Sequence, residues 1–382
     1  MPAPLHVITV FGTRPEAVKL APVIHELRRQ PNAFRVTVAV TGQHRELLDQ
    51  FLRCFDIAAD VDLNLMTAAQ SVTQVTARAL AGLEAVLADY QPEIVLVQGD
   101  TATVFAAALA AFYQQIPVGH VEAGLRSGNV YEPFPEEALR RMTTVVSTLH
   151  FAPTAHARAA LLRDGVDAES VFVTGNTVVD ALHSILPSLP VAQPAAGRTI
   201  LVTAHRRENL GAPMVSICHA LLQLLERFPD VRIVFPVHPN PAVRQVVFGL
   251  LDRHQRIELR EPADYLEFLT LMRDAHLIIS DSGGVQEEAP VFGKPVLVLR
   301  RTTERPEGIA AGVSALVGTK TATIVEHASR LLSDRDAYAA MSRPSNPYGD
   351  GLASQRIEQA LRFHFGRSDR RPEDWVPDKT CN

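Results

Sequence analysis

The alternation of short apolar runs with longer amphipathic stretches constrains this chain more than any other feature. Helical periodicity is expected over 16–29, 71–89, 103–114 and 136–148 in the first half of the chain. The strand candidates are His6–Phe11, Arg35–Thr41, Ile94–Gln98, Val118–Val121, His150–Ala152, Thr199–Thr203, Arg232–Val237, Ile257–Leu259, Leu277–Ser280 and Val296–Leu299. Near-continuous apolar strands separated by helices are typical of parallel sheets covered on both faces. The pattern therefore predicts an α/β protein.

The length of 382 residues favours more than one hydrophobic core. We predict two doubly wound, Rossmann-like domains whose parallel sheets face a central cleft. The first is expected over residues 1–170 and the second over 171–352, with a last helix at 353–366 that rejoins the first domain. The Pro- and Ala-rich stretch Pro187–Gly197 is interpreted as a surface loop rather than the hinge, and the polar tail 367–382 as loosely ordered.

Composition excludes several classes of protein. A formal net charge of −5 argues against a nucleic-acid-binding surface, which needs a basic excess. The three cysteines are far apart, so neither a disulfide framework nor a zinc site is expected. The N-terminus lacks the features of a signal peptide, and no apolar run approaches the roughly 20 residues that span a bilayer. We therefore expect a cytoplasmic protein with no membrane contact.

Polar residues gather where the predicted strands end, and in open α/β sheets ligands bind at those ends. Gly12-Thr13-Arg14-Pro15-Glu16 follows the first strand, with Lys19 one helical turn further on. Arg14 and Lys19 could neutralise a phosphate, although a helix cap with two surface cations explains this motif equally well.

Carboxylates follow the next strands. Asp100 and Glu122 each leave a strand that should neighbour the other, so both can reach one site. Glu136 and Glu137 open the helix that carries Arg140, a position that acidic residues also favour for reasons of helix dipole alone. Two or three carboxylates at one site are what proton abstraction at carbon and protonation of a leaving group require.

The second half repeats the arrangement with cations. His205-Arg206-Arg207 ends one strand and His238 lies after the next. Ser282, Gly283 and Gly284 begin a helix whose backbone N–H groups could bind an anion. Further on, Glu288 could accept hydrogen bonds from ribose hydroxyls, and Arg305 adds another cation. A Ser-Gly-Gly turn alone can also be a simple helix cap.

Known cofactor motifs are missing from the sequence. There is no Walker P-loop, no GxGxxG fingerprint and no cluster with zinc spacing. These absences favour a reaction without NAD and without a metal, so an epimerisation here would proceed without hydride transfer.

Eleven sequence runs together resemble the non-hydrolysing UDP-N-acetylglucosamine 2-epimerases of bacteria, which have the GT-B fold. The resemblance extends from residue 8 to residue 351. The matching runs are VFGTRPEAVKLAP, TGQHRELLDQ, GDTATV, FYQQIPVGHVEAGLRSG, PFPEEALRR, VTGNTVVDAL, LVTAHRREN, PVHPNP, DSGGVQEEAP, GKPVLVLRRTTERPEG and NPYGDG.

The resemblance implies reversible C2 epimerisation of UDP-GlcNAc to UDP-ManNAc through a 2-acetamidoglucal intermediate, supplying precursors for cell-surface polysaccharide. It implies that Asp100, Glu122 and Glu136 are the acid/base carboxylates and that His205 contacts the diphosphate or sugar with a catalytic role. The residues that it implies for substrate binding are Arg14, Lys19, Arg140, Ser282, Gly283, Gly284, Glu288 and Arg305. Which carboxylate removes the C2 proton in each direction stays open.

The resemblance also implies a homodimer and a second molecule of UDP-GlcNAc that acts as an allosteric activator. The matching positions for this second ligand are Gln43, Gln70, Glu136, Arg207 and His238. Three residues depart from the family pattern, in which His, Asn and Gly stand where this chain has Gln98, Leu139 and Ala204.

Four other interpretations remain. A relative that acts on a UDP-diacetamido-uronic acid would keep the reaction and change the sugar. A GT-B glycosyltransferase would consume an acceptor and exchange no C2 proton. A nucleotide-sugar sensor would bind without turnover, and a hydrolysing relative would release free ManNAc. The three retained carboxylates argue against the sensor.

Overall fold

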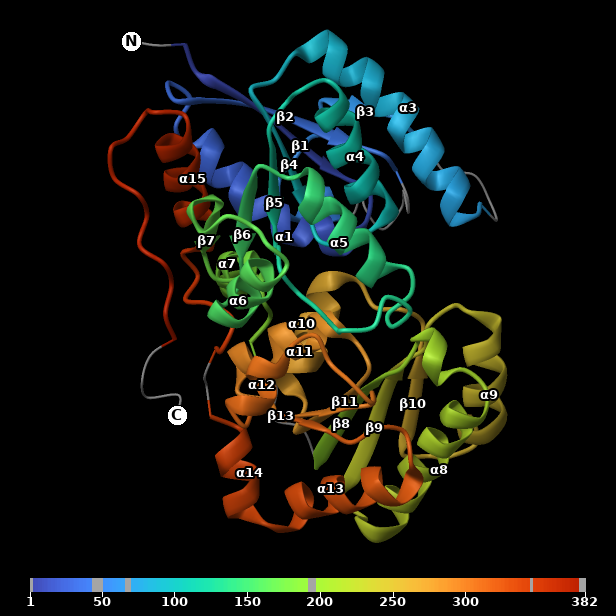
Figure 1. The fold of residues 1–382 in the computed structure, drawn as a ribbon. Coiled ribbons are helices and arrows are strands. Elements are labelled where there is room, and N and C mark those ends of the chain that lie inside the picture. The colour runs from blue at the N-terminus through green and yellow to red at the C-terminus, as the bar shows by residue number, and fades with distance from the viewer. Residues whose placement is uncertain (1–2, 43–50, 66–69, 192–196, 344–345, 378–382) are drawn as a thin grey trace. The chain divides into compact units, whose positions relative to one another are not determined.

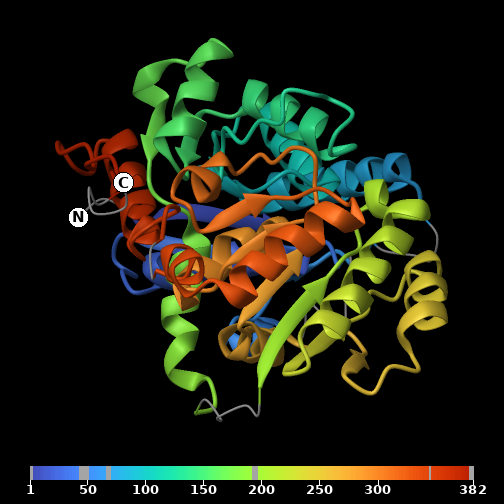
Figure 2. The same ribbon diagram turned by 90° about the horizontal axis from the view of Figure 1, so that it is seen from below.

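The computed structural model describes residues 3–42, 51–65, 70–191, 197–343 and 346–377, which divide into two compact units. The first unit comprises the described residues up to Ser184 together with 348–377, and the second those of 185–347. Figures 1 and 2 show the ribbon in two views, with helices and strands alternating in both units.

The first unit is built on a seven-stranded sheet in the order β3-β2-β1-β4-β5-β6-β7, and each pair of neighbours is parallel. Its strands are β1 (Leu5–Phe11), β2 (Phe34–Val40), β3 (Val61–Asp62), β4 (Ile94–Gln98), β5 (Val118–Val121), β6 (Leu149–Ala152) and β7 (Val171–Val173). Its helices are α1 (Arg14–Arg28), α3 (Val72–Tyr90), α4 (Ala102–Tyr113), α5 (Glu136–Val146), α6 (Ala155–Arg163), η1 (Ala168–Ser170), α7 (Thr177–Ile185) and α15 (Ala353–His364).

Both faces of this sheet are covered, which is why its strands read as continuous apolar runs. Ile8 and Val10 point to one face and pack with residues of α3 and α4, while the alternate residues Val7 and Phe11 are equally buried on the other face. On that second face α15 packs against α1, and the red and blue helices lie side by side in Figure 1.

The second unit has a six-stranded parallel sheet in the order β10-β9-β8-β11-β12-β13. Its strands are β8 (Arg198–Thr203), β9 (Val231–Pro236), β10 (Ile257–Arg260), β11 (Leu277–Ser280), β12 (Val296–Val298) and β13 (Ser314–Leu316). Its helices are η2 (Leu186–Ser188), η3 (Arg207–Asn209), α8 (Ala212–Arg227), α9 (Pro241–Leu251), α10 (Tyr265–Asp274), α11 (Gly283–Glu288), η4 (Ala289–Phe292), α12 (Pro306–Ala310), α13 (Thr321–Ser333) and α14 (Arg335–Met341).

Alternating residues of these strands also enter two different cores. Ile200 and Val202 pack with α8 and α13, whereas Leu201 between them packs with residues from α10 and α11. In each sheet the strand order changes direction beside the first strand, between β1 and β4 and between β8 and β11. Such switch points are where open α/β sheets bind ligands. The prediction of two doubly wound parallel-sheet units is confirmed.

The limits of the units differ from the predicted ranges. β7 is the last strand of the first sheet, since Val171 pairs with His150 of β6. The first unit therefore continues through α7 to Ser184, and the division falls just before Pro187–Gly197 instead of near residue 170. The three buried residues of β7 are too short a pattern to predict a strand from the sequence. The boundary between the two units was therefore predicted too early, at residue 170.

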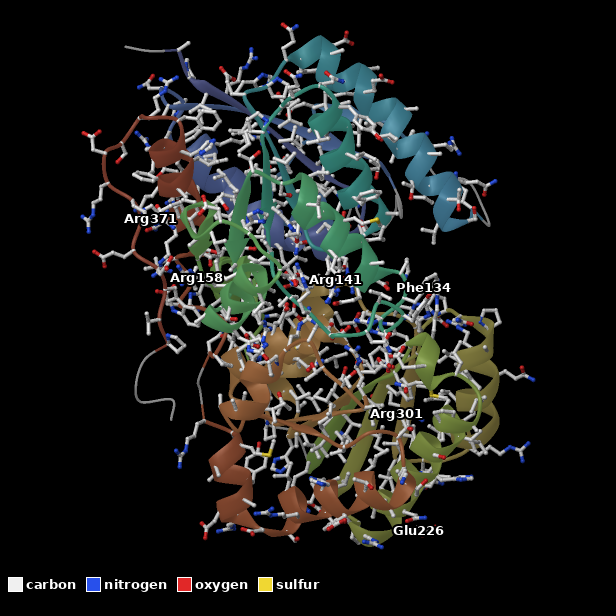
Figure 3. All side chains as sticks on the ribbon, viewed as in Figure 1. Phe134, Arg141, Arg158, Glu226, Arg301 and Arg371 are labelled. Carbon is white, nitrogen blue, oxygen red and sulfur yellow. The ribbon has the colours of Figure 1, made fainter. Side chains whose placement is uncertain are left out.

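The C-terminal tail corrects a second expectation. Up to Pro377 it is not loosely ordered, because it packs along β7 of the first unit. The N–H of the buried Trp375 donates to the carbonyl of Val173 at 2.7 Å, and the N–H of Val173 donates to Asp374 Oδ1 at 2.8 Å. The guanidinium of Arg371, labelled in Figure 3, lies 4.1 Å from the ring centroid of Phe172.

Candidate active site

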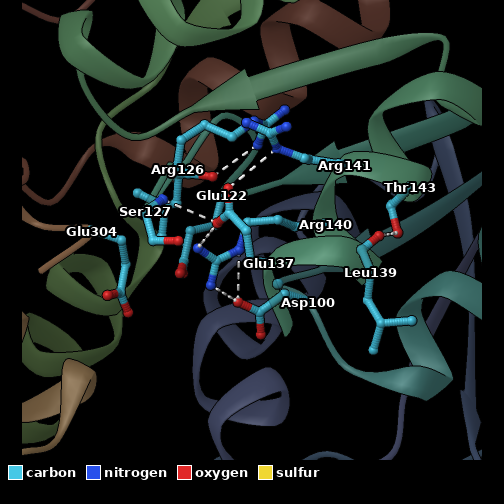
Figure 4. A network of polar contacts seen from close by, with 12 residues as sticks. Asp100, Glu122, Arg126, Ser127, Glu137, Leu139, Arg140, Arg141, Thr143 and Glu304 are labelled. Atoms are coloured by element: carbon cyan, nitrogen blue, oxygen red, sulfur yellow. Dashed lines mark hydrogen bonds and ion pairs between the residues drawn. The ribbon is translucent and has the colours of Figure 1, made fainter. Parts of the chain in front are cut away.

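Asp100 stands at the carboxyl end of β4, directly after Gly99, whose φ of 87° turns the chain sharply out of the sheet. The guanidinium of Arg140 on α5 donates from Nε to Asp100 Oδ2 at 3.1 Å and forms a second contact through Nη2. Figure 4 shows this pair within a larger polar network. The structure thus joins two of the predicted site residues in one ion pair.

Glu122 follows β5 and has a φ of 66°, which is in the left-handed region that a non-glycine residue rarely adopts. Its buried carboxylate forms an ion pair with the buried ammonium of Lys19 from α1. The amide Nε2 of Gln98 donates to the same Oε2 at 2.8 Å. An unusual backbone conformation held by two side-chain partners is typical of a functional position.

Glu136 and Glu137, which share a helix N-terminus, differ in their surroundings. Glu137 is fully buried and accepts hydrogen bonds from the N–H of Ser127 at 3.0 Å, from Arg140 at 3.0 Å and from Arg141 at 3.2 Å. Within the described part of the chain, Glu136 Oε2 is buried without a hydrogen-bond partner. Glu137 therefore organises the network, whereas Glu136 keeps an oxygen available to a ligand.

The turn after β1 packs tightly, and Glu16 closes it. Glu16 accepts hydrogen bonds from the N–H groups of Gly12 at 2.6 Å and Thr13 at 3.1 Å, and burial raises the pKa of its carboxyl. A Cβ at position 12 would stand 2.3 Å from Thr41 Oγ1, so only glycine fits there. Arg14 is the half-buried first residue of α1. The predicted capping role of this motif is confirmed, and Arg14 lies in the first turn of the capped helix.

In the second unit, His205 follows β8 and is half-buried. Its ring stacks on that of His238, with centroids 5.3 Å apart and an angle of 11° between the planes. Asp281, at the end of the neighbouring strand β11, approaches His205 Nδ1 with its Oδ1 at 3.3 Å. The sequence predicted His205 and His238 as separate contacts, and the structure brings them together.

Ser282, Gly283 and Gly284 lie at the start of α11, as predicted. The N–H of Ser282 donates to Ser280 Oγ at 3.0 Å, which leaves the N–H groups of the two glycines at the first turn of the helix. A Cβ on Gly283 would stand 2.7 Å from the guanidinium of Arg305, whereas Gly284 has only Ser282 Oγ within reach, at 3.9 Å.

Arg305 and Glu288 are both buried and occupied by protein partners. Arg305 Nε donates to Glu287 Oε1 at 2.6 Å and Nη1 pairs with Glu304, so the guanidinium is fixed against the glycine turn. Glu288 Oε1 accepts a hydrogen bond from the hydroxyl of Tyr265 at 3.0 Å. Arg305 thus supports the predicted anion-binding turn directly.

The predicted allosteric residues are spread over both units. Arg207 begins η3 and His238 follows β9, and both are exposed. In the first unit, Gln70 donates from Nε2 to the carbonyl of Leu65 at 3.2 Å. Gln43 lies outside the described residues.

The three departures from the family pattern have different surroundings. Gln98 hydrogen-bonds Glu122, Leu139 packs with Val75 and Ala102 in a small core, and Ala204 belongs to the core of the second unit. Gln98 is the one of the three that touches a predicted catalytic carboxylate. An amide there supplies a hydrogen bond and no titrating group.

Sequence reasoning missed several partners that hold these side chains, namely Tyr265, Asp281, Glu287 and Glu304, and it named Glu137 without assigning it this role. Asp281 could have been found by the rule that selected Asp100, because it also follows a strand directly. Tyr265 and Glu287 contact their partners from 23 and 18 positions away, whereas Glu304 is the sequence neighbour of Arg305. The described residues contain no group of three His, Cys, Asp or Glu side chains arranged to hold a metal ion, and no helix among them is long and apolar enough to cross a membrane.

Taken separately, the two units offer complementary chemistry. The first unit carries acidic groups held by cations at the ends of β4 and β5, a set suited to moving a proton to and from carbon. The second unit carries a glycine turn at a helix start together with His205, a set suited to binding and discharging an anion.

The comparisons with known proteins agree with this chemistry. The family model described as UDP-N-acetylglucosamine 2-epimerase matches residues 25–362. The UDP-N-acetylglucosamine 2-epimerase of Bacillus subtilis is 50% identical over 376 residues, covering 97% of this chain and 99% of the relative. That of Escherichia coli K12 is 50% identical over 372 residues, covering 94% and 98%.

Solved structures give the same result. The crystal structure of UDP-GlcNAc 2-epimerase from Neisseria meningitidis bound to UDP-GlcNAc has a TM-score of 0.91 and 48% identity, and the match covers 94% of this chain and 99% of that one. The structure of the glycotransferase of kitacinnamycin, at 14% identity and a TM-score of 0.64, shares the fold alone. The predicted GT-B fold is confirmed, and the chain belongs to the UDP-N-acetylglucosamine 2-epimerase family.

Proposed function

We propose that this protein interconverts UDP-GlcNAc and UDP-ManNAc by elimination and re-addition of UDP. A carboxylate removes the C2 proton, the C1–O bond to UDP breaks, and a C1–C2 double bond forms. A second acid/base group then delivers a proton to the opposite face of C2, while the diphosphate oxygen re-forms its bond to C1. The reaction is redox-neutral and uses no NAD or metal. The observation that carries the proposal is the set of cation-held carboxylates Asp100 and Glu122 in a chain of this family.

The residue roles follow from the contacts. Asp100, Glu122 and Glu136 serve as the acid/base groups, and Lys19 and Arg140 hold the first two in place. Oε2 of Glu136 is buried and has no hydrogen-bond partner among the residues that the structure describes, which supports a role for Glu136 at the ligand.

UDP would be bound by the second unit. The N–H groups of Gly283 and Gly284 face the diphosphate, whose negative charge grows as the C1–O bond breaks. Glu288 binds the ribose, and His205 acts at the diphosphate or the sugar. Arg14 adds a cation for the phosphates, and Arg305 lies by the uridine end while fixing the turn that contains Gly283.

The protein would act in the cytoplasm as a homodimer. Its product would supply ManNAc units for cell-surface polysaccharide. A second UDP-GlcNAc, bound by Gln43, Gln70, Glu136, Arg207 and His238, would act as an activator. The stack of His238 on His205 supports this part of the proposal, since it places a residue of the second ligand's set against a catalytic one.

Proton NMR in deuterated water tests the reaction. We expect deuterium at C2 of both UDP-GlcNAc and UDP-ManNAc and no free ManNAc. Asp100→Asn and Glu122→Gln should each slow this exchange at least about 100-fold while UDP affinity, measured by calorimetry, changes less than about threefold.

Asp164→Asn is the matched control, because it breaks an Arg126–Asp164 pair of the same type, with 2.8 Å between Nε and Oδ2, elsewhere in the first unit. Native exchange in either active-site variant would remove that residue from the mechanism. Consumption of an acceptor sugar without C2 exchange would instead indicate a glycosyltransferase. Exchange with a diacetamido-uronic acid nucleotide alone would change the substrate.

A further inference from the structure

Asp281 is fully buried at the end of β11 and accepts the hydrogen bonds that hold the loop carrying His205. Its Oδ2 accepts three hydrogen bonds, each 2.9 Å long, from the N–H groups of His205 and Arg206 and from Nδ2 of Asn209. These bonds tie the end of β8 to the end of the neighbouring strand. One carboxylate oxygen is thus enough to hold the loop.

The other oxygen, Oδ1, has a different environment. It is buried, it has no hydrogen bond among the described residues, and it lies 3.3 Å from His205 Nδ1. A buried acceptor without a donor is costly, so a purely structural aspartate would leave this oxygen unexplained. A small rotation of the imidazole makes the contact a hydrogen bond. The side chain of His205 is 36% exposed.

We propose that Asp281 is a positioning residue that holds the His205 imidazole with its proton on Nδ1 and leaves the lone pair on Nε2. An ionised carboxylate only accepts hydrogen bonds, so it selects the tautomer with a proton on the facing nitrogen. In this tautomer Nε2 is the ring nitrogen that can accept a proton or a hydrogen bond from the ligand. The stack on His238 restricts the ring further. The inference rests on the proposed function only in giving His205 a role in turnover.

The tautomer can be measured without any assay of activity. In protein labelled with ¹⁵N-histidine, the His205 signals, identified by their loss in His205→Asn, should show a protonated Nδ1 and an unprotonated Nε2 at pH 8. In Asp281→Asn the amide presents an N–H to Nδ1, so we expect the proton to move to Nε2. A wild-type His205 with its proton on Nε2, or an unchanged tautomer in Asp281→Asn, would overturn the proposal.

Turnover supplies the second readout. Asp281→Asn should lower kcat for C2 exchange by on the order of 100-fold or more, with the Kd of UDP changed less than about threefold. Asn209→Ala is the matched control, since it removes a donor to Oδ2 and leaves Oδ1 facing His205. It should keep the Nδ1–H tautomer and most of kcat. An equal loss of kcat in both variants would assign the effect to the loop and contradict the proposal.

The two proposals fail in distinguishable ways. If His205→Asn exchanged C2 protons at the native rate, the role of His205 in the proposed function would be wrong, while the tautomer would still decide the role of Asp281. If Asp281→Asn did not fold, the wild-type spectrum alone would decide, because the tautomer of His205 is read there without a substitution at Asp281.

Discussion

At the scale of single residues, a side chain that lies close against the backbone explains why glycine is required at some positions. Gly283 is the clearest case, since the guanidinium of Arg305 occupies the space where a side chain would begin. Arg305 cannot easily withdraw, because Glu287 and Glu304 hold it inside the protein. The glycine is therefore needed for packing, independently of the anion-binding role that we propose for it.

Gly283→Ala should destabilise the protein by about 1–3 kcal/mol, because the new Cβ must displace the held guanidinium. Gly284→Ala is the matched control: its Cβ would have Ser282 Oγ as its only near neighbour, at 3.9 Å, and alanine favours a helical position. Urea unfolding followed by circular dichroism measures both. Equal stability of the two variants would show that Arg305 yields without cost.

At the scale of elements, the neighbouring strands β5 and β6 carry a pair of histidines in register, His120 and His150. Burial lowers the pKa of His120 to about 4. Burial, together with repulsion by His120 and Arg126, lowers that of His150 to about 3. Nε2 of His120 donates to the carbonyl of Gly99 at 2.7 Å, a contact that raises the pKa of the ring, but burial has the larger effect and lowers it.

These two histidines predict acid sensitivity. Their folded pKa values lie below the unfolded value of about 6.5, so the unfolded state binds more protons. Their contribution to stability is complete above about pH 6.5 and is lost as the pH falls towards 4 and then 3. His150→Phe removes one of the two protons, so the slope of unfolding free energy against pH should fall by up to about 1.4 kcal/mol per pH unit.

The expectation can be checked by urea unfolding of His150→Phe and of the wild type. Measurements at roughly pH 4.5, 5.5, 6.5 and 7.5 span the range in which the two histidines lose their contribution to stability. The comparison between the two proteins isolates this histidine from the carboxyl groups that also titrate. Parallel stability curves would mean that His150 is protonated equally in both states.

The edge of the first sheet depends on the C-terminal segment. The chain around Trp375 hydrogen-bonds the exposed side of β7 and buries the indole against it, so an otherwise open edge is covered. Trp375→Ala should cost about 3 kcal/mol of stability and promote aggregation. Glu373→Ala, at an exposed position of the same segment, should change stability by less than about 0.5 kcal/mol. Light scattering and urea unfolding measure the two effects.

At the scale of the whole molecule, the chain makes one unit from two separate stretches and the other from one continuous stretch. The second unit has its own sheet and two buried clusters, one on each face. Residues 185–347 expressed alone should therefore fold cooperatively and bind UDP through the turn at Gly283. A fragment of residues 1–184 should be unstable, because it lacks α15 and the segment that covers β7.

Heteronuclear NMR of the two fragments, with UDP titrated into the second, tests this expectation. Dispersed spectra and UDP-dependent shifts for 185–347 would support an independent UDP-binding unit. A spectrum typical of a disordered chain for residues 185–347 would show that this unit depends on the rest of the chain for its stability. UDP-dependent shifts in the fragment of residues 1–184 would instead place the nucleotide site in the first unit.

The sequence by itself determined the longer strands, although not β3, β7 or β13, together with several helices and the residues at the strand ends. Those features are local, since a buried strand needs an apolar run and a helix start needs a capping residue. It therefore identified Asp100, Glu122, His205 and the Ser282 turn, which all follow recognisable runs. Family resemblance added the reaction, which residue chemistry alone could not specify.

Only the tertiary structure decided the partners. Lys19 meets Glu122 across 103 positions and Asn209 meets Asp281 across 72, and no local pattern encodes such pairs. The same holds for β7, a three-residue strand that exists because β6 and the C-terminal segment flank it. Long-range pairs depend on which strands become neighbours, and that choice is made by the packing of the entire sheet. The alternating pattern predicted two parallel sheets, and folding set which residues meet at their ends.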